Sequence, residues 1–146
     1  MSRALQRTSA VAAMATAAVL LAGCAGQSEY CQAVEENAST LESLGKDRSD
    51  AAYTQYAETF ETVAADAPES VKAQWTELAE ATRGVLAAQS DVGLALEDMG
   101  DDAKVAELSS DQLASLNEAY ETFNATTDQR TAVVKNVKQE CDITLQ

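Results

Sequence analysis

The chain has 146 residues, with 24 acidic and 10 basic side chains and a formal net charge of −14. This length predicts one domain, and the acidic balance provides no basic patch to neutralise phosphates, so we expect no nucleic-acid partner. The chain contains no histidine, which removes the usual base beside a catalytic serine or cysteine and a common metal ligand. We therefore predict neither catalytic activity nor a resident metal.

The first 23 residues have the pattern of a signal peptide. Arg3 and Arg7 provide a basic start, and an apolar stretch over residues 10–21 follows them. A stretch of roughly a dozen residues suits an export signal, whereas a membrane-spanning helix needs about 20. We therefore expect an exported protein from which residues 1–23 are cleaved.

Cys24 ends the sequence Leu21-Ala22-Gly23-Cys24, which resembles the lipobox of bacterial lipoproteins. The resemblance implies a diacylglycerol on the Cys24 thiol and a fatty acid on the new N-terminus, with no other cofactor. The protein would then be held by its lipid at the extracytoplasmic face of the cell membrane, with residues 24–28 as a short tether. The alternative is an ordinary signal peptide followed by a chance cysteine.

Two further cysteines, Cys31 and Cys141, remain in the predicted mature chain. An even pair of cysteines in an oxidising compartment predicts a disulfide bond. Two free thiols are the alternative.

Residues 29–146 are predicted to form an all-helical domain. Good helix formers dominate this part, which contains one proline. Apolar residues at alternating three- and four-residue steps predict the long helices, and in the last helix this seam continues through Thr127, Val134 and Val137. These helices cover residues 29–44, 50–65, 68–99 and 110–141. Gly45 should end the first helix, a bend is expected near Gly93, a short turn over 103–108, and a break within 124–127 is compatible with the polar residues there.

About four helices with short connections predict an antiparallel up-down-up-down bundle. Cys31 begins the first helix and Cys141 ends the last. An even number of helices brings these two positions to the same end of the bundle, where a disulfide can join the first and last helices.

Four polar residues lie in the apolar seams of the last two long helices: Thr82, Gln89, Thr127 and Arg130. In an antiparallel pair, Thr82 faces Thr127 and Arg130 lies one turn further along. Two interpretations remain open. The group is either a polar layer that fixes the helix register or a site for a small anion or ligand, with Arg130 as its charged member and Gln89 as a neighbour.

Two other groups of residues allow a structural or a functional interpretation. The aromatic residues of the seams form the core or line an apolar ligand pocket. The acidic cluster at Glu97, Asp98, Asp101 and Asp102 offers oxygen ligands for a cation but lacks the spacing of an EF-hand loop. Cation binding by this cluster stays an open question.

The chain resembles the small all-helical lipoproteins of actinobacteria. Four features carry the resemblance: the lipobox, Tyr30-Cys31-Gln32-Ala33-Val34, Ala67-Pro68-Glu69-Ser70-Val71 followed by Trp75, and Glu140-Cys141-Asp142-Ile143. This chain departs from many of those relatives in having Asp142 where they have glycine. The resemblance implies an extracytoplasmic helical domain with a terminal disulfide, and it implies no activity.

These observations together predict a membrane-anchored lipoprotein that acts as a binding module at the cell envelope. The membrane, through the lipid, and an envelope protein are its expected partners. The alternative is a carrier or receptor for a small ligand held inside the bundle.

Overall fold

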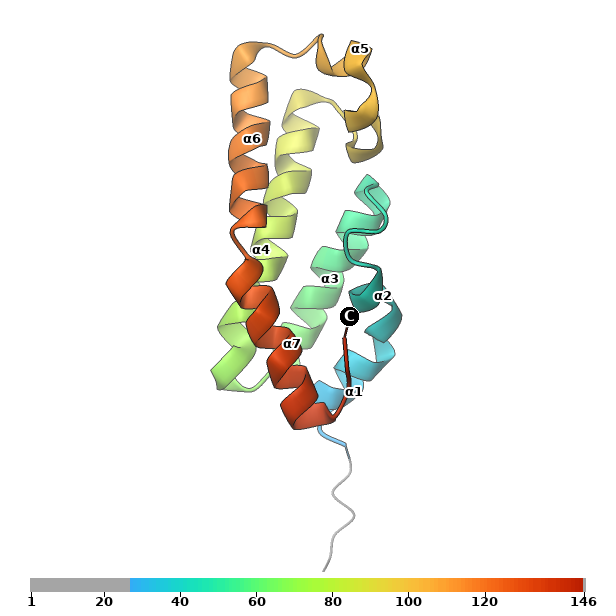
Figure 1. The fold of residues 1–146 in the computed structure, drawn as a ribbon, viewed down its shortest axis with the longest axis vertical. Helices are drawn as coiled ribbons and strands as arrows, with labels where there is room; N and C mark the ends of the chain where they lie inside the picture. Colours follow the sequence, from blue (N-terminus) through green and yellow to red (C-terminus); the bar gives the residue numbers. More distant parts are fainter. Residues whose placement is uncertain (1–26, 146) are drawn as a thin grey trace, which may run out of the picture.

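A computed structural model describes residues 27–145, and this part of the chain is helical and contains no strand. The predicted all-helical class is therefore confirmed. The predicted signal peptide, Cys24 and most of the tether lie outside the described residues. The helices, in chain order, are α1 Glu29–Glu36, α2 Ala38–Ser43, α3 Asp50–Asp66, α4 Glu69–Val92, the 3-10 helix η1 Leu96–Gly100, α5 Asp102–Val105, α6 Ser110–Asn124 and α7 Thr127–Cys141 (Figure 1).

The first predicted helix is interrupted at Asn37, so the expectation of one continuous helix over residues 29–44 was wrong. The Asn37 side-chain amide donates a hydrogen bond of 2.8 Å to the carbonyl of Ala33. Such side-chain bonds compete with the regular helical pattern, which is why asparagine is a poor residue for a helix interior. Gly45 follows α2 with a positive φ of 79°, as expected for the residue after a helix end.

The third predicted helix ends at Val92 and does not reach Met99. Gly93 adopts a left-handed conformation with φ of 70°, and the N–H of Leu94 donates to the carbonyl of Gln89 at 3.2 Å. This bond and the one that the Gly93 N–H donates to the Ser90 carbonyl satisfy carbonyl groups at the helix end, as in a Schellman motif. Pro68 precedes the helix as its N-cap residue, and the helix begins at Glu69.

The last predicted helix is divided into α6 and α7 at Ala125 and Thr126. The division rotates the buried face by one residue, since Thr126 and Val133 are buried while Thr127 and Val134 are exposed. The continuous seam that placed Thr127 and Val134 in the core was therefore wrong for these two positions.

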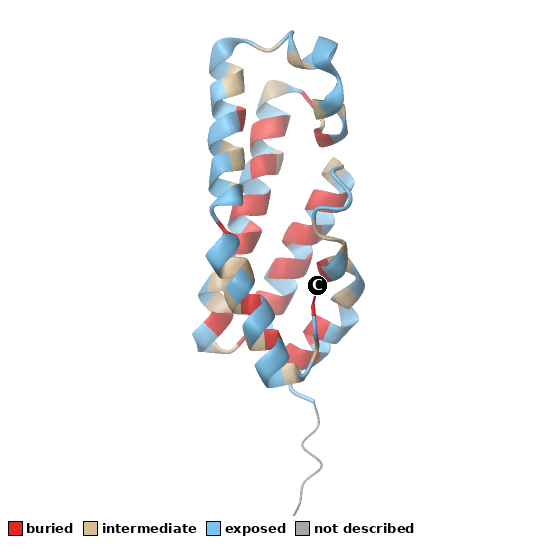
Figure 2. Cartoon of the chain, in the orientation of Figure 1, coloured by how far each residue is buried: buried red, intermediate tan, exposed pale blue. Residues whose placement is uncertain are grey.

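The helices form a bundle in which α3 and α4 share the most extensive interface. Helix α4 also contacts α6 and α7, while α1 contacts α3 and α7. Figure 2 shows buried residues along both α3 and α4, whereas α6 and α7 are mostly exposed. The core includes Tyr30, Tyr53, Tyr56, Phe60 and Trp75, so most of the aromatic stripe predicted from the sequence is core.

Candidate functional site

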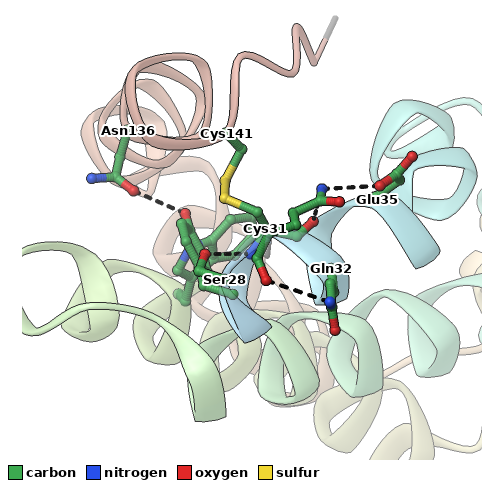
Figure 3. The surroundings of a disulfide bond; sticks show 9 residues. Ser28, Cys31, Gln32, Glu35, Asn136 and Cys141 are labelled. Atoms are coloured by element: carbon green, nitrogen blue, oxygen red, sulfur yellow. Dashed lines mark hydrogen bonds between the residues drawn. A yellow bond between two sulfur atoms is a disulfide. The ribbon is translucent and has the colours of Figure 1, made fainter. Parts of the chain in front are cut away.

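The disulfide between Cys31 and Cys141 joins α1 to α7, with their Cα atoms 5.3 Å apart. The predicted pairing is therefore confirmed. Figure 3 shows its surroundings, where the Ser28 hydroxyl accepts the backbone N–H of Cys31 at 3.2 Å and so caps α1. This bond fixes the start of the first helix next to the disulfide.

Tyr30 links three helices beside the disulfide. Its hydroxyl donates to Asn136 of α7 at 2.9 Å and accepts from the indole N–H of Trp75 of α4 at 3.2 Å. Burial raises the pKa of Tyr30, the hydrogen bond from Trp75 lowers it, and the charge of Glu140 raises it further. The tyrosine therefore remains neutral and serves as a structural junction.

The predicted pairing of Thr82 with Thr127 does not occur. Thr82 is fully buried, and its hydroxyl donates to the Leu78 carbonyl of its own helix at 2.7 Å. Thr127 is exposed, and its hydroxyl donates to Asn124 at 3.2 Å. The break before α7 causes this difference, because it turns Thr126 inward in place of Thr127.

Gln89 lies in the interior, as predicted, with 1% of its surface exposed. Its amide donates to the Tyr120 hydroxyl of α6 at 2.7 Å, while its side-chain carbonyl oxygen has no hydrogen-bond partner within residues 27–145. Burial raises the pKa of Tyr120, and the hydrogen bond from Gln89 partly offsets this. The pair joins α4 to α6 and leaves one buried acceptor open to a hydrogen-bond donor.

Arg130 is half-buried at the break between α6 and α7. Its guanidinium lies over the Phe123 ring, 5.4 Å from the centroid, and donates to the carbonyls of Phe123 and Asn124 at 3.5 and 3.4 Å. These contacts place a cation at the carboxyl end of α6, where the helix dipole favours positive charge. Arg130 and Gln89 thus have separate partners.

A groove of about 280 Å³ opens beside Arg130, and we refer to it as the Arg130 groove. Arg130 and Val134 of α7 belong to its lining. Its other large side chains are apolar: Leu41, Leu44, Phe60, Phe123, Val133 and Leu145. Leu44, Val133 and Leu145 were not among the site residues predicted from the sequence. For Leu145, the available signal was the presence of apolar residues in the segment after Cys141.

Two basic side chains influence the interior near this groove. Burial raises the pKa of Tyr53, and the positive charges of Arg48 and Arg130 act in the opposite direction. The Tyr53 ring also packs on Phe123, with centroids 5.7 Å apart. Both arginines therefore lie close enough to Tyr53 to act on its pKa, and Arg130 also lines the groove.

The acidic cluster has structural partners. Glu97 accepts the backbone N–H of Asp50 at 3.1 Å, Asp98 pairs with Lys104 at 2.7 Å, and the Asp101 side chain caps α5. Among residues 27–145, no group of three or more histidine, cysteine or acidic side chains is placed to hold a metal ion.

Comparisons with protein-family models, curated proteins and solved structures found no match to this chain. Within residues 27–145, no helix combines the length and the apolar character needed to cross a membrane.

Proposed function

We propose that the protein is a lipoprotein, anchored through Cys24 to the extracytoplasmic face of the cell membrane, that acts as a binding module at the cell envelope. The Cys31–Cys141 disulfide is the observation that supports this most. Disulfides persist in oxidising compartments outside the cytoplasm, and a cleaved signal peptide with a lipobox leads to such a compartment.

The lipid would act through position. Cys24 lies only a few residues before Cys31, so the disulfide end of the bundle would lie next to the membrane. Anchoring raises the effective concentration of a binding module near envelope proteins in the same membrane. Catalysis is not part of the proposal, since the chain contains no histidine to activate a serine or cysteine.

We further propose that the helices are arranged as four rods running up, down, up and down: α1 with α2, α3, α4, and α6 with α7. The short connection at Ala67 and Pro68 supports opposite directions for α3 and α4. The disulfide supports an even number of rods, because it joins the start of the first helix to the end of the last one, which lie at the same end of the bundle only when the number of rods is even. Engineered cysteine pairs between neighbouring rods provide the test, since a cysteine at the start of one rod can form a disulfide with a cysteine at the end of its neighbour only if the two rods run in opposite directions.

The anchor is tested by feeding cells a palmitate analogue and separating their membranes. We expect the wild-type chain to carry the label and to sediment with membranes, and the Cys24→Ala variant to lose both properties. The matched control replaces Cys31 and Cys141 by alanine, which removes the same type of residue and should keep the label. Labelled or membrane-bound Cys24→Ala protein contradicts the proposal.

A second candidate function, a carrier or receptor for a small ligand, is favoured by one observation. The Arg130 groove combines an apolar lining with a guanidinium group, which is the composition of many small-molecule sites. The candidate site therefore lies at this groove, away from the interior layer of Thr82 and Thr127 considered from the sequence.

A further inference from the structure

The Arg130 groove contains the most exposed large apolar side chain of the described residues. Val134 is 39% exposed, and no other large hydrophobic side chain within residues 27–145 is classed as exposed. It lies one turn after Arg130 on α7, so an apolar and a positively charged group lie side by side at the groove. This pairing suits a ligand that has both an apolar part and a negative charge.

The charge of α7 differs from that of the other helices. Arg130, Lys135 and Lys138 outnumber its two acidic residues, Asp128 and Glu140. Every other helix of residues 27–145 has as many acidic as basic side chains or more. In a chain with a net charge of −14, this helix is where a negatively charged group meets the least repulsion.

Arg130 retains donors for an additional acceptor. Its bonds to the two carbonyls are long, at 3.5 and 3.4 Å, and its third contact is with the face of Phe123. None of the ion pairs found within residues 27–145 includes it. A guanidinium has five N–H donors in a planar fork that matches a carboxylate, so a carboxylate can bind without displacing an acidic side chain.

The size of the groove restricts the apolar part of the ligand. Its volume of about 280 Å³ is close to the lower limit of small-molecule sites, which is about 300 Å³. This space suits one acyl chain better than the two chains of a membrane lipid.

From these contacts and charges we infer that the Arg130 groove binds a fatty acid, that is, a carboxylic acid with a single acyl chain. The acyl chain would lie along Leu44, Val133 and Leu145, and the carboxylate would bind Arg130. The inference rests on the ligand-carrier candidate above, and it does not depend on the lipid at Cys24.

Dodecanoate is the probe, added below its micelle concentration to the full chain carrying Cys24→Ala. Titration calorimetry should detect one binding site per chain. Dodecanol and dodecyltrimethylammonium share the chain length without the negative charge, so we expect each to bind at least tenfold more weakly. Equal binding of dodecyltrimethylammonium, or no binding of dodecanoate, overturns the inference.

Two variants locate the site. Arg130→Gln should weaken dodecanoate binding about tenfold, while Arg83→Gln should leave it unchanged. Arg83 is the matched control because the same charge is removed from an exposed arginine that is paired with Glu61. Unchanged binding in Arg130→Gln contradicts the site.

A third variant guards against unfolding. Val134→Glu introduces a carboxylate on an exposed position, so the fold should persist, as circular dichroism can verify. We expect it to weaken dodecanoate binding at least as much as Arg130→Gln does. Wild-type affinity in this variant also overturns the inference, whereas the palmitate labelling of Cys24 tests the anchor separately.

Discussion

The α3–α4 pair, with helices of 17 and 24 residues, and the α6–α7 arm, with two helices of 15 residues, differ far more in burial than in length. Both α3 and α4 bury residues at nearly every turn, whereas α6 buries only Leu116 and α7 only Val133 and Val137. The pair therefore supplies most of the hydrophobic stabilisation. The arm is fixed to it by fewer contacts and carries the Arg130 groove.

This difference indicates a division of roles within one small domain. Segments with few buried apolar contacts open more easily than the core, and binding sites are often found in such segments. The disulfide at Cys141 and the Gln89–Tyr120 hydrogen bond hold the arm in place. Removing individual attachments should show how far the arm depends on them.

The largest effect is expected for the disulfide. Replacing Cys31 and Cys141 by alanine opens a loop of 110 residues, and the chain-entropy model gives a loss of about 4–5 kcal/mol in the free energy of unfolding. Urea unfolding measures this loss. Amides of α6 and α7 should then exchange with solvent faster than those of α3 and α4.

The two single cysteine variants serve as controls for that prediction. Each should lower stability by the same amount as the other, since either one breaks the same bond. If only one variant is destabilised, or if the α3–α4 pair loses protection first, the comparison between pair and arm is wrong.

A smaller effect is expected for the buried face of α7. Val133 is 3% exposed and Val134 39%. Val133→Ala should cost about 2 kcal/mol, from two lost methyl groups and the cavity left behind, while Val134→Ala should change stability by less than about 0.5 kcal/mol. Thermal unfolding of the two variants decides the matter, and the reverse order would restore the continuous seam expected from the sequence.

The smallest effect is expected for Tyr30, which connects the arm to the pair. Tyr30→Phe removes the acceptor of the Trp75 indole N–H and the donor to Asn136. Leaving these groups without a partner should cost about 1–2 kcal/mol. Equilibrium unfolding at neutral pH measures this loss, and wild-type stability in the variant would show that the link is not needed.

The same residue predicts a pH dependence. Burial raises the pKa of Tyr30 in the folded chain above its ordinary value of 10.0. The Tyr30 hydroxyl therefore loses its proton at a lower pH in the unfolded chain than in the folded chain. The stability that Tyr30 provides is complete below pH 10.0 and is lost as the pH rises through the folded-state pKa. Tyr30→Phe should show a shallower loss of stability above pH 10.0, while a parallel pH profile would exclude this role.

The features that the sequence predicted correctly are those with regular spacing or paired chemistry. Cys31 and Cys141 could be paired from their number and from the compartment that the sequence predicts, and the buried positions Val71, Trp75 and Leu78 follow the helical period. Gly93 was expected only to bend this helix, and it instead ends α4 through a backbone conformation that glycine adopts readily.

The remaining features depend on local competition and on contacts distant in sequence. The break at Asn37 arises from a side-chain hydrogen bond that competes with the helix. Thr126 faces inward because of the way α7 packs after the break. The residue spacing within one helix does not predict how the chain packs after such a break. The Arg130 groove requires the segment ending at Leu145 to fold back onto Leu44, and that segment has no helical period.

The position of the disulfide determines how the domain carries mechanical load. Tension applied between residues 27 and 145 passes from Cys31 directly to Cys141, because the covalent bond is the shortest path between them. The helices between these cysteines lie outside the loaded path. Stretching by optical tweezers should extend only the short ends of the oxidised domain, whereas the reduced chain should unravel through its full length.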